Sequence, residues 1–411
     1  MKSNGLSLHP PPRKIGSRDV DFFVTFVTSI HNEATGRRQR PFHRNRGCYA
    51  DALGISYPQE MQAEPIKSFI SARVSELALL RRIRTRVTRS PHPRLTLGIG
   101  DDCALLRLRP GEEMAVTTDL SLAGRHFRID WHPPEAIGHR ALARGLSDLA
   151  AMGVRPLAAF LSLGLPRKLV QSSKGREPWL DRFLDGFLAL AGAYQIPLAG
   201  GDLAESPIPV ADIVLTGAVR RGKALLRSGA RPDDLLYVTG SLGGAAAGLA
   251  RLAQLAAAPK QSRSRQQHPD SLRIPSRLKA LLAPHLYPSP RVAQGLWLAR
   301  RPLATAAIDL SDGLSTDLAH LCEESGVAAQ VDAAALPVHP AATPAQALHG
   351  GEEYELLFTA PPTARVPSRI QGVAVTRIGR IAAQRPSTPP VTLLTPTGPL
   401  PLSPQGWQHF S

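Results

Sequence analysis

Five short motifs place aspartate carboxylates at the ends of apolar segments or within glycine turns. They are residues 98–102 (Gly-Ile-Gly-Asp-Asp), 117–119 (Thr-Thr-Asp), 146–148 (Leu-Ser-Asp), 200–202 (Gly-Gly-Asp) and 308–312 (Ile-Asp-Leu-Ser-Asp). A single Asp in a turn is common, but five such motifs predict carboxylates that converge on one centre and repel unless cations neutralise them. Mg²⁺ and Ca²⁺ prefer oxygen ligands, and Mg²⁺ shared between carboxylates and substrate phosphates is typical of phosphoryl transfer.

The first two motifs each leave an alternative open. Asp101 and Asp102 are adjacent, so on an extended chain only one is expected to reach a shared metal, and a plain polar turn explains the motif equally well. Residues 117–119 close a predicted strand and offer hydroxyl, carbonyl and carboxylate oxygens suited to Mg²⁺. The competing interpretation of Asp119 is a helix N-cap.

The other motifs lie on predicted helices and turns. Asp148 interrupts a largely apolar helix, so its carboxyl must find a cation, change its protonation state or reach water. Residues 200–202 are predicted to form a tight turn after a strand. Asp309 and Asp312 flank Ser311 at a strand-to-helix junction, where Ser311 or Asp312 could be only the helix N-cap.

Two further segments could contact a ligand. Residues 125–127 offer an arginine, His126 and a phenylalanine near the end of the strand that carries Asp119, although a single His is more often a surface or core residue. Residues 350–355 (Gly-Gly-Glu-Glu-Tyr-Glu) put three acids after a glycine pair, and one of them is expected to face a ligand.

The elements that must position these groups alternate between strands and helices. Hydrophobic periodicity predicts a helix over 71–84, and glycine and proline signals bound the later elements. Strands are expected at 113–118, 157–165, 213–220, 234–239 and 304–310, helices at 137–152, 179–194 and 314–322, and edge strands within 358–390. The glycines of 240–248 form a strand-to-helix turn that could admit a phosphate at a helix N-terminus, or be an ordinary α/β turn.

The length of 411 residues predicts two domains, since single cores stop growing near 250–300 residues. We predict a poorly ordered basic extension over 1–65, an N-terminal domain over 66–225 that binds ATP and metal, and a C-terminal domain over 226–411. A basic surface insertion is expected at 258–280. Met61 precedes the first periodic segment. We therefore hypothesise that translation starts at Met61 and that residues 1–60 come from a start codon assigned too far upstream.

The net charge of +16 could indicate a nucleic-acid-binding protein. Much of the excess, however, lies in residues 1–60 and 259–280, and neither segment has the interleaved aromatics of a nucleic-acid platform. The three cysteines form no CxxC pair, which favours reduced thiols in the cytoplasm. The apolar segment 22–30 is too short to cross a membrane.

Together the motifs resemble the thiamine-monophosphate kinases of the aminoimidazole ribonucleotide synthetase-like superfamily. The resemblance runs from about residue 72 to the C-terminus and keeps the family's motif order. It is carried by residues 98–106, 117–127, 141–158, 199–206, 225–249, 287–291, 306–321, 350–358 and 406–410.

The resemblance implies an α/β, two-domain fold and a homodimer whose N-terminal sheets join into a barrel. It also implies phosphorylation of thiamine monophosphate to thiamine diphosphate by ATP, with several Mg²⁺ ions. The metal ligands would be Asp102, Thr117, Thr118, Asp119, Asp148, Asp202, Asp309 and Asp312. ATP would contact Gly201, Asp202, Arg227 and Ser311, and thiamine monophosphate would contact His126, Glu352 and Phe410. Asp119, Asp148 and Asp202 would be the catalytic carboxylates.

The expected mechanism is in-line attack of the substrate's phosphate oxygen on the γ-phosphorus of ATP. The sequence contains no Walker A motif, GxxxxGK[ST], so a P-loop kinase is not supported. Two positions depart from the family: Glu353 stands where Asp is usual, and residues 203–206 lack the threonines that commonly follow Gly-Gly-Asp. The alternatives are another ATP-using member of the superfamily, and a basic nucleic-acid-binding protein.

Overall fold

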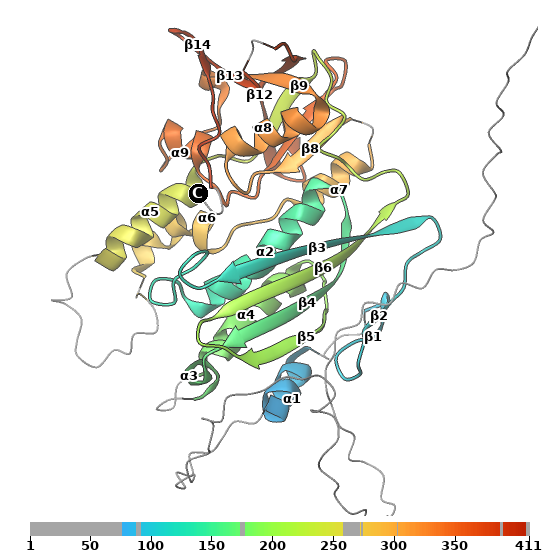
Figure 1. Cartoon of the computed structure of the whole chain (residues 1–411), viewed down its shortest axis with the longest axis vertical. Helices are drawn as coiled ribbons and strands as arrows, with labels where there is room; N and C mark the ends of the chain where they lie inside the picture. The colour runs from blue at the N-terminus through green and yellow to red at the C-terminus, as the bar shows by residue number, and fades with distance from the viewer. Residues whose placement is uncertain are drawn as a thin grey trace, which may run out of the picture.

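A computed structural model describes residues 76–87, 92–172, 177–257, 272, 274–301, 303–386 and 389–407. The predicted extension over 1–65, most of the insertion at 258–280 and Phe410 lie outside the described residues. Figure 1 shows two parts, with a mainly green sheet below and the orange and red C-terminal strands above.

The N-terminal part contains a four-stranded sheet with two long helices on one face. Its elements are α1 (Glu76–Val87), β1 (Leu95–Leu97), β2 (Leu105–Leu106), β3 (Glu112–Leu122), α2 (Pro134–Ala151), β4 (Arg155–Leu165), α3 (Arg167–Val170), α4 (Trp179–Ala193), β5 (Leu198–Glu205) and β6 (Val210–Arg220). The strand order is β3-β6-β4-β5, and only the pair β4–β5 is parallel. The 3.6-residue period in α2 and α4 therefore produces one apolar face on each helix, buried against the sheet.

The strands of this sheet alternate between two environments. Ile213 and Leu215 of β6 are fully buried in the core beneath the helices. On the opposite face, Val116 and Leu120 of β3 are 55% and 47% exposed. Strands β3 and β5 are the two edges of this sheet. The edge strand β3 therefore carries an exposed apolar stripe.

Helices α2 and α4 approach closely at glycines, which allows a stability test. A Cβ added to Gly186 would lie 1.8 Å from the carbonyl oxygen of Glu135, whereas a Cβ at Gly192 on the same helix would meet nothing within 4 Å. We expect Gly186→Ala to destabilise the protein by about 1–3 kcal/mol, the usual cost of overpacking. Gly192→Ala should be neutral or stabilising by up to about 1 kcal/mol.

Denaturant unfolding of the two variants compares the same substitution in one helix. Equal midpoints for Gly186→Ala and Gly192→Ala would show that the two helices do not pack as closely as described.

The C-terminal part is built around an eight-stranded, mainly antiparallel sheet with strand order β14-β13-β9-β12-β7-β10-β8, and β11 pairs with β12. Its elements are β7 (Leu235–Thr239), α5 (Gly244–Ala257), α6 (Lys279–Leu286), α7 (Val292–Ala299), β8 (Ala306–Asp309), α8 (Leu314–Ser325), β9 (Val327–Asp332), α9 (Pro344–His349), β10 (Leu356–Ala360), β11 (Arg369–Ile370), β12 (Val373–Ala383), β13 (Val391–Thr395) and β14 (Gly398–Pro401).

Two local predictions differ from the structure. The two longer strands of 358–390 are not edge strands: β10 lies between β7 and β8, and β12 between β9 and β7, whereas the short β11 pairs only with β12. Every residue of β10 is buried, so it shows the continuous apolar pattern of an internal strand. Residues 200–202 form no tight turn but lie inside β5. Gly201 is needed there because its φ is 143° and an added Cβ would lie 1.9 Å from the carbonyl oxygen of Leu161.

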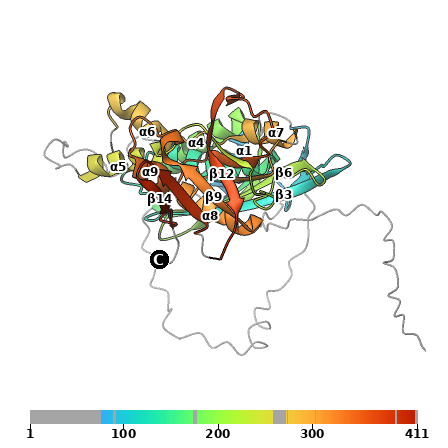
Figure 2. The same cartoon turned by 90° about the horizontal axis from the view of Figure 1, so that it is seen from above.

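Helix α2 connects the two parts. It packs against β3 and β6 on one side and against β8 and α7 on the other. Seen from above, α5 and α6 project at one end of the molecule while β3 and β6 reach the other (Figure 2). In the described residues, no helix is long and apolar enough to span a membrane.

Candidate active site

A cavity of about 820 Å³, which we call the central cavity, lies between the two parts and is lined by many polar side chains. Helix α2, the end of β3, the residues after β8 and the loop 350–354 supply its walls. Seven of the predicted site residues line it: Asp119, His126, Asp148, Asp309, Ser311, Asp312 and Glu352. The sequence motifs that lie far apart in the chain therefore meet at this cavity.

One end of the central cavity is acidic. Asp119 and Thr117 lie on the same face of β3, with Thr117 donating its hydroxyl hydrogen bond to Asp148 of α2. Ser147 donates to Oδ2 of Asp309 at 2.6 Å. Because Asp119 lies within β3 rather than before a helix, the alternative of a helix N-cap is wrong.

The carboxylates at this end repel one another. Burial, followed by repulsion from Asp309 and Asp119, raises the pKa of Asp148 to about 7. Burial also raises the pKa of Asp309, opposed by the Ser147 hydrogen bond and by the charge of Arg227. Burial and mutual repulsion both disfavour the charged form of these carboxyls, and a bound cation would relieve the repulsion.

The start of α8 is held by a different acid from the one expected. Gly313 precedes the helix with φ 117°, and neither Ser311 nor Asp312 caps it. Asp317 Oδ2 instead accepts hydrogen bonds from the backbone N–H groups of Asp312 and Gly313, at 3.1 and 3.0 Å. The cap interpretation of Ser311 and Asp312 was wrong, and both line the central cavity.

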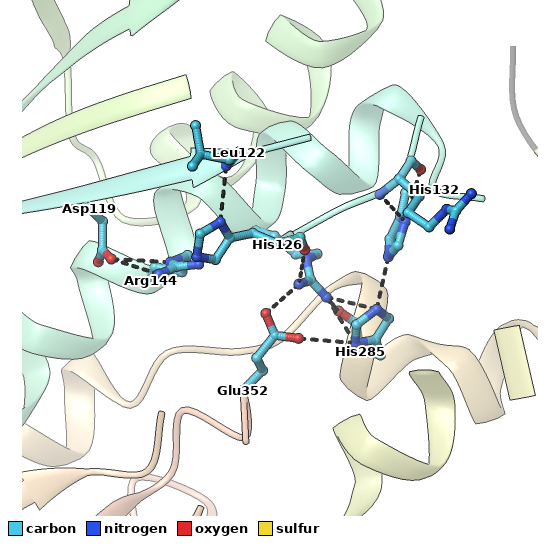
Figure 3. Close-up of polar contacts among 9 residues, drawn as sticks. Asp119, Leu122, His126, His132, Arg144, His285 and Glu352 are labelled. Carbon is cyan, nitrogen blue, oxygen red and sulfur yellow. Dashed lines mark hydrogen bonds and ion pairs between the residues drawn. The ribbon is translucent and has the colours of Figure 1, made fainter. Parts of the chain in front are cut away.

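The other end of the central cavity is an ion-pair and imidazole network (Figure 3). Arg140 Nη2 lies 2.5 Å from Oε1 of Glu352, and the same guanidinium donates to the carbonyl oxygens of His285 and His126 at 2.8 and 3.1 Å. His285 and His132 face each other with their Nε2 atoms 3.0 Å apart. Burial and the charge of Arg140 lower the pKa of His132 to about 4, and that of His285 falls well below its ordinary value.

The three glutamates of the loop 350–355 contact different parts of the protein. Glu352 has φ 64°, a left-handed conformation that costs energy in a non-glycine residue and is held by its N–H bond to the Ser311 carbonyl at 2.7 Å. Glu353 Oε1 accepts from the N–H of Ala245 at 3.0 Å, at the start of α5. That carboxylate occupies the helix N-terminus where a phosphate was considered, which favours the alternative of an ordinary α/β turn. Glu355 pairs with Arg291 and accepts from Thr239.

Three of the other predicted site residues lie at a second, small cavity of about 80 Å³ beside β5, which we call the edge cavity. Asp102, Gly201 and Asp202 line it, together with Asp101. Asp101 Oδ1 accepts the backbone N–H of Asp102 at 2.9 Å, and both aspartates are exposed.

The edge cavity is separated from Asp119 within one chain. Asp119 is in register with Ile213, on the helix side of the sheet, whereas Asp202 pairs through Ser162 with Asp212, on the opposite side. Three strand spacings separate β3 from β5, which is about 14 Å at ~4.8 Å each. The side chain of Thr118 also faces away from Thr117 and Asp119.

Arg227 is not among the residues that line the central cavity. Arg227 is exposed, although its charge acts on both Asp148 and Asp309. Phe410 lies beyond the described residues. Among the aromatic residues that line the central cavity, Trp407 lies nearest to Phe410 in the sequence. It is 47% exposed and donates its backbone N–H to the Asp312 carbonyl at 3.1 Å.

Two arginines of the site were missed by sequence reasoning. Arg144 donates from Nε and Nη2 to Oδ1 of Asp119, at 3.2 and 3.0 Å (Figure 3). Arg140, Arg144 and Asp148 recur every four residues of α2, a spacing that puts all three on one helical face. That spacing was a readable signal, but the interpretation of Asp148 as an isolated acid in an apolar helix hid it.

Within the described parts of the chain, no three Asp, Glu, His or Cys side chains are placed to hold a metal ion together. The donor set nevertheless suits a hard cation, since the acidic end offers only carboxylate and hydroxyl oxygens. Mg²⁺ typically takes one or two protein carboxylates and completes its shell with water and substrate phosphates.

Comparison with known families covers most of the chain. Residues 100–219 match the family described as AIR synthase related protein, N-terminal domain, and residues 231–389 match its C-terminal domain. The thiamine-monophosphate kinase of Escherichia coli K12 is 38% identical over 348 residues, which is 82% of this chain and 98% of that protein. The enzyme of the same name from Bacillus subtilis 168 is 31% identical over 330 residues, covering 78% of this chain and 95% of that protein.

Solved structures are similar over comparable lengths. The thiamine-monophosphate kinase of Stenotrophomonas maltophilia K279a is 38% identical, covers 78% of this chain and 96% of its own, and has a TM-score of 0.63. AaThiL complexed with AMPPCP and TMP is 29% identical, covers 82% and 97%, and has a TM-score of 0.59. The hydrogenase maturation protein HypE in complex with ATP is 18% identical, with a TM-score of 0.57 over 81% of this chain and 95% of that one, and shares the fold.

Proposed function

The chain belongs to the thiamine-monophosphate kinase family, with the AIR synthase-like two-domain α/β fold, and on that premise we propose how it transfers phosphate. The enzyme catalyses ATP-dependent phosphorylation of thiamine monophosphate to thiamine diphosphate. We assign this reaction to the central cavity. The observation that carries the assignment is the meeting of an acidic end, at Asp119, Asp148 and Asp309, with a ligand-binding end at Glu352 and His126.

The reaction needs positioning and charge compensation more than it needs a base. The phosphate oxygen of thiamine monophosphate is already anionic near neutral pH, so it can attack the γ-phosphorus of ATP in line, with ADP leaving on the opposite side. The protein holds the two polyanions next to each other in one cavity, which is the entropic part of the catalysis. This transfer does not require a Ser–His pair to activate the attacking oxygen.

Mg²⁺ fits the acidic end, where Asp119, Asp148, Asp309 and Asp312 would hold it together with the hydroxyl of Thr117. The feature of this chain that supports cation binding is the convergence of Asp119, Asp148 and Asp309 on the same wall of the central cavity, where their like charges repel. When bound, Mg²⁺ supplies charge neutralisation for the phosphates of ATP. Asp102, Asp202 and the backbone of Thr118 belong to the same proposed ligand set.

A homodimer would bring the two halves of this ligand set together. Strands β3 and β5 are the open edges of the N-terminal sheet, and the exposed face carries Val116 and Leu120. Pairing β3 of one chain with β5 of its partner closes two sheets into a barrel, removes four open edges and covers the apolar stripe. It also places Asp202 of the partner subunit beside β3, the strand that carries Asp119.

ATP would lie between the two cavities in such a dimer. Gly201 and Asp202 line the edge cavity, Ser311 lines the central cavity, and Arg227 lies close enough to influence Asp148 and Asp309. Since ATP and thiamine monophosphate are intracellular metabolites, we place the reaction in the cytoplasm.

Trp407 is proposed as the aromatic wall for the thiamine rings, a role that the sequence motif had suggested for Phe410. Stacking of a heterocycle on an aromatic side chain is worth about 1–3 kcal/mol, so Trp407→Ala should raise KM for thiamine monophosphate roughly 10- to 100-fold. KM for ATP should be unchanged, and Trp407→Phe should recover most of the loss. Initial-rate kinetics with each substrate varied separately measure this, and an effect on ATP instead would remove Trp407 from the acceptor end.

The function is tested by incubating the purified protein with ATP, Mg²⁺ and thiamine monophosphate, and separating the products by chromatography. Thiamine diphosphate and ADP should appear in equal amounts. A folded protein that forms no diphosphate at any Mg²⁺ concentration would rule out the kinase assignment. Steep salt-dependent binding of nucleic acid, with no turnover, would instead favour the nucleic-acid-binding alternative.

A further inference from the structure

Two arginines of α2 lie one helical turn apart, and only Arg144 lines the central cavity. Arg140 is only 4% exposed, and its two terminal nitrogens are used by Glu352, by two backbone carbonyls and by the ring of His285. Arg144 directs Nε and Nη2 to one oxygen of Asp119. No hydrogen bond from its Nη1 is formed to any described residue. A guanidinium carries five N–H donors, so two of those on Arg144 remain available to the cavity.

The position of Arg144 lies between the two ends of the central cavity. Its side chain is 18% exposed and pairs with Asp119 at the acidic end. It also interacts electrostatically with Glu352 and Tyr354 at the ligand-binding end. Figure 3 shows Arg144 between Asp119 and the ring of His126. Arg144 therefore lies between the end proposed to bind the metal and the end proposed to bind the acceptor.

We propose that Arg144 binds the phosphate of the acceptor substrate and thereby selects phosphorylated thiamine over thiamine; this proposal rests on the proposed function. Arg144 would keep its bond to Asp119 and offer Nη1 to a phosphate oxygen. In that arrangement Arg144 would bridge the acceptor phosphate and Asp119, the proposed metal ligand on β3. Guanidinium–phosphate pairing is charge-assisted and directional, which suits the orientation of an attacking oxygen.

Other cations near the cavity fit this role less well. Arg128 is exposed, pairs with Asp130 and stacks over Trp131 with its guanidinium 4.6 Å from the ring centroid. Arg125 lines the cavity but is exposed at its rim. In contrast, Arg144 is largely desolvated, and a charge-assisted hydrogen bond is stronger where water is excluded.

The test compares equilibrium binding of thiamine monophosphate and thiamine, two ligands that differ by the phosphate alone. Isothermal titration calorimetry of the full chain, without ATP and at fixed Mg²⁺, gives the ratio of their dissociation constants. Arg144→Gln should weaken thiamine monophosphate binding about 10- to 100-fold, as expected for one charged hydrogen-bond pair, and leave thiamine binding unchanged. Arg144→Lys should recover part of the ratio. Arg167→Gln is the matched control and should keep the wild-type ratio, because Arg167 is 61% exposed, pairs with Glu205 and lines neither cavity.

An unchanged ratio in folded Arg144→Gln overturns the proposal, as does an equal loss of both ligands. If Arg144→Gln does not fold, Arg144→Lys decides: a wild-type ratio there, together with a wild-type KM for thiamine monophosphate, also overturns it. These results are separate from the kinase assay. Wild-type protein that binds thiamine monophosphate but forms no diphosphate contradicts the proposed function, while the binding ratio still tests Arg144.

Discussion

An Asp119→Asn enzyme should form thiamine diphosphate on the order of 10³-fold more slowly than the wild type, the upper range for removal of one preorganised electrostatic group. Asparagine has nearly the same shape, so the loss measures the charge. Asp119 faces the acidic end, receives two hydrogen bonds from Arg144 and belongs to the proposed Mg²⁺ ligands. The measurement is kcat at saturating ATP and thiamine monophosphate, together with the midpoint of thermal unfolding.

Asp185→Asn provides a matched control. Asp185 lies on α4, its side chain is 48% exposed, and it forms an ion pair with Arg86 away from both cavities. A surface pair of this kind contributes about 0–1 kcal/mol to stability, so the control should keep its activity. If Asp119→Asn retains activity within about tenfold of the control, a change worth ~1.4 kcal/mol, Asp119 does not hold the metal.

The helices and strands of the core were predicted with nearly correct bounds, because their hydrophobic periodicity matches the faces that are buried. The predicted helix at 179–194 corresponds to α4, Trp179–Ala193, and its apolar face packs on α2 and the sheet. The predicted strand at 157–165 lies within β4, Arg155–Leu165. In contrast, 358–390 was predicted as edge strands because its alternation is weak, and an internal strand buried on both faces shows little alternation.

Site residues could be predicted from the sequence where the chemistry of one side chain requires a partner. Asp148 is a carboxyl in an apolar helix, and the structure gives it a hydroxyl partner and a raised pKa. Sequence could not predict which acid caps α8, because Asp312 and Asp317 both lie close to the helix start. Nor could it show that Glu353 caps α5, since the two segments lie more than a hundred residues apart. Such pairings depend on tertiary contacts.

The division between the two cavities could not be deduced from the motifs either. Gly-Gly-Asp and Thr-Thr-Asp are both strand residues, and their separation depends on strand order and on the face that each side chain takes. The order β3-β6-β4-β5 puts Asp119 and Asp202 at opposite edges. A single chain therefore leaves the proposed ligand set incomplete, and the proposed dimer becomes part of the catalytic hypothesis.

Mixed dimers of Asp119→Asn and Asp202→Asn chains should be active although each variant alone is not. If Asp119 of one chain works with Asp202 of the partner subunit, a mixed dimer has one site with both substitutions and one site with neither. Random assortment makes half of the dimers mixed, so the mixture should recover about a quarter of wild-type activity. Mixed dimers isolated with two affinity tags should reach about half, since one of two sites is intact.

This experiment separates the two geometries more sharply than either variant alone. Each single substitution removes a charge and is expected to inactivate the enzyme whether the two carboxylates act within one chain or across two. If they act within one chain, every site of a mixed dimer lacks one carboxylate, and the purified mixed dimer stays as inactive as its parents. An active wild-type monomer in sedimentation analysis would likewise exclude the shared site. Recovery occurs only if the edge cavity of one chain completes the central cavity of the other.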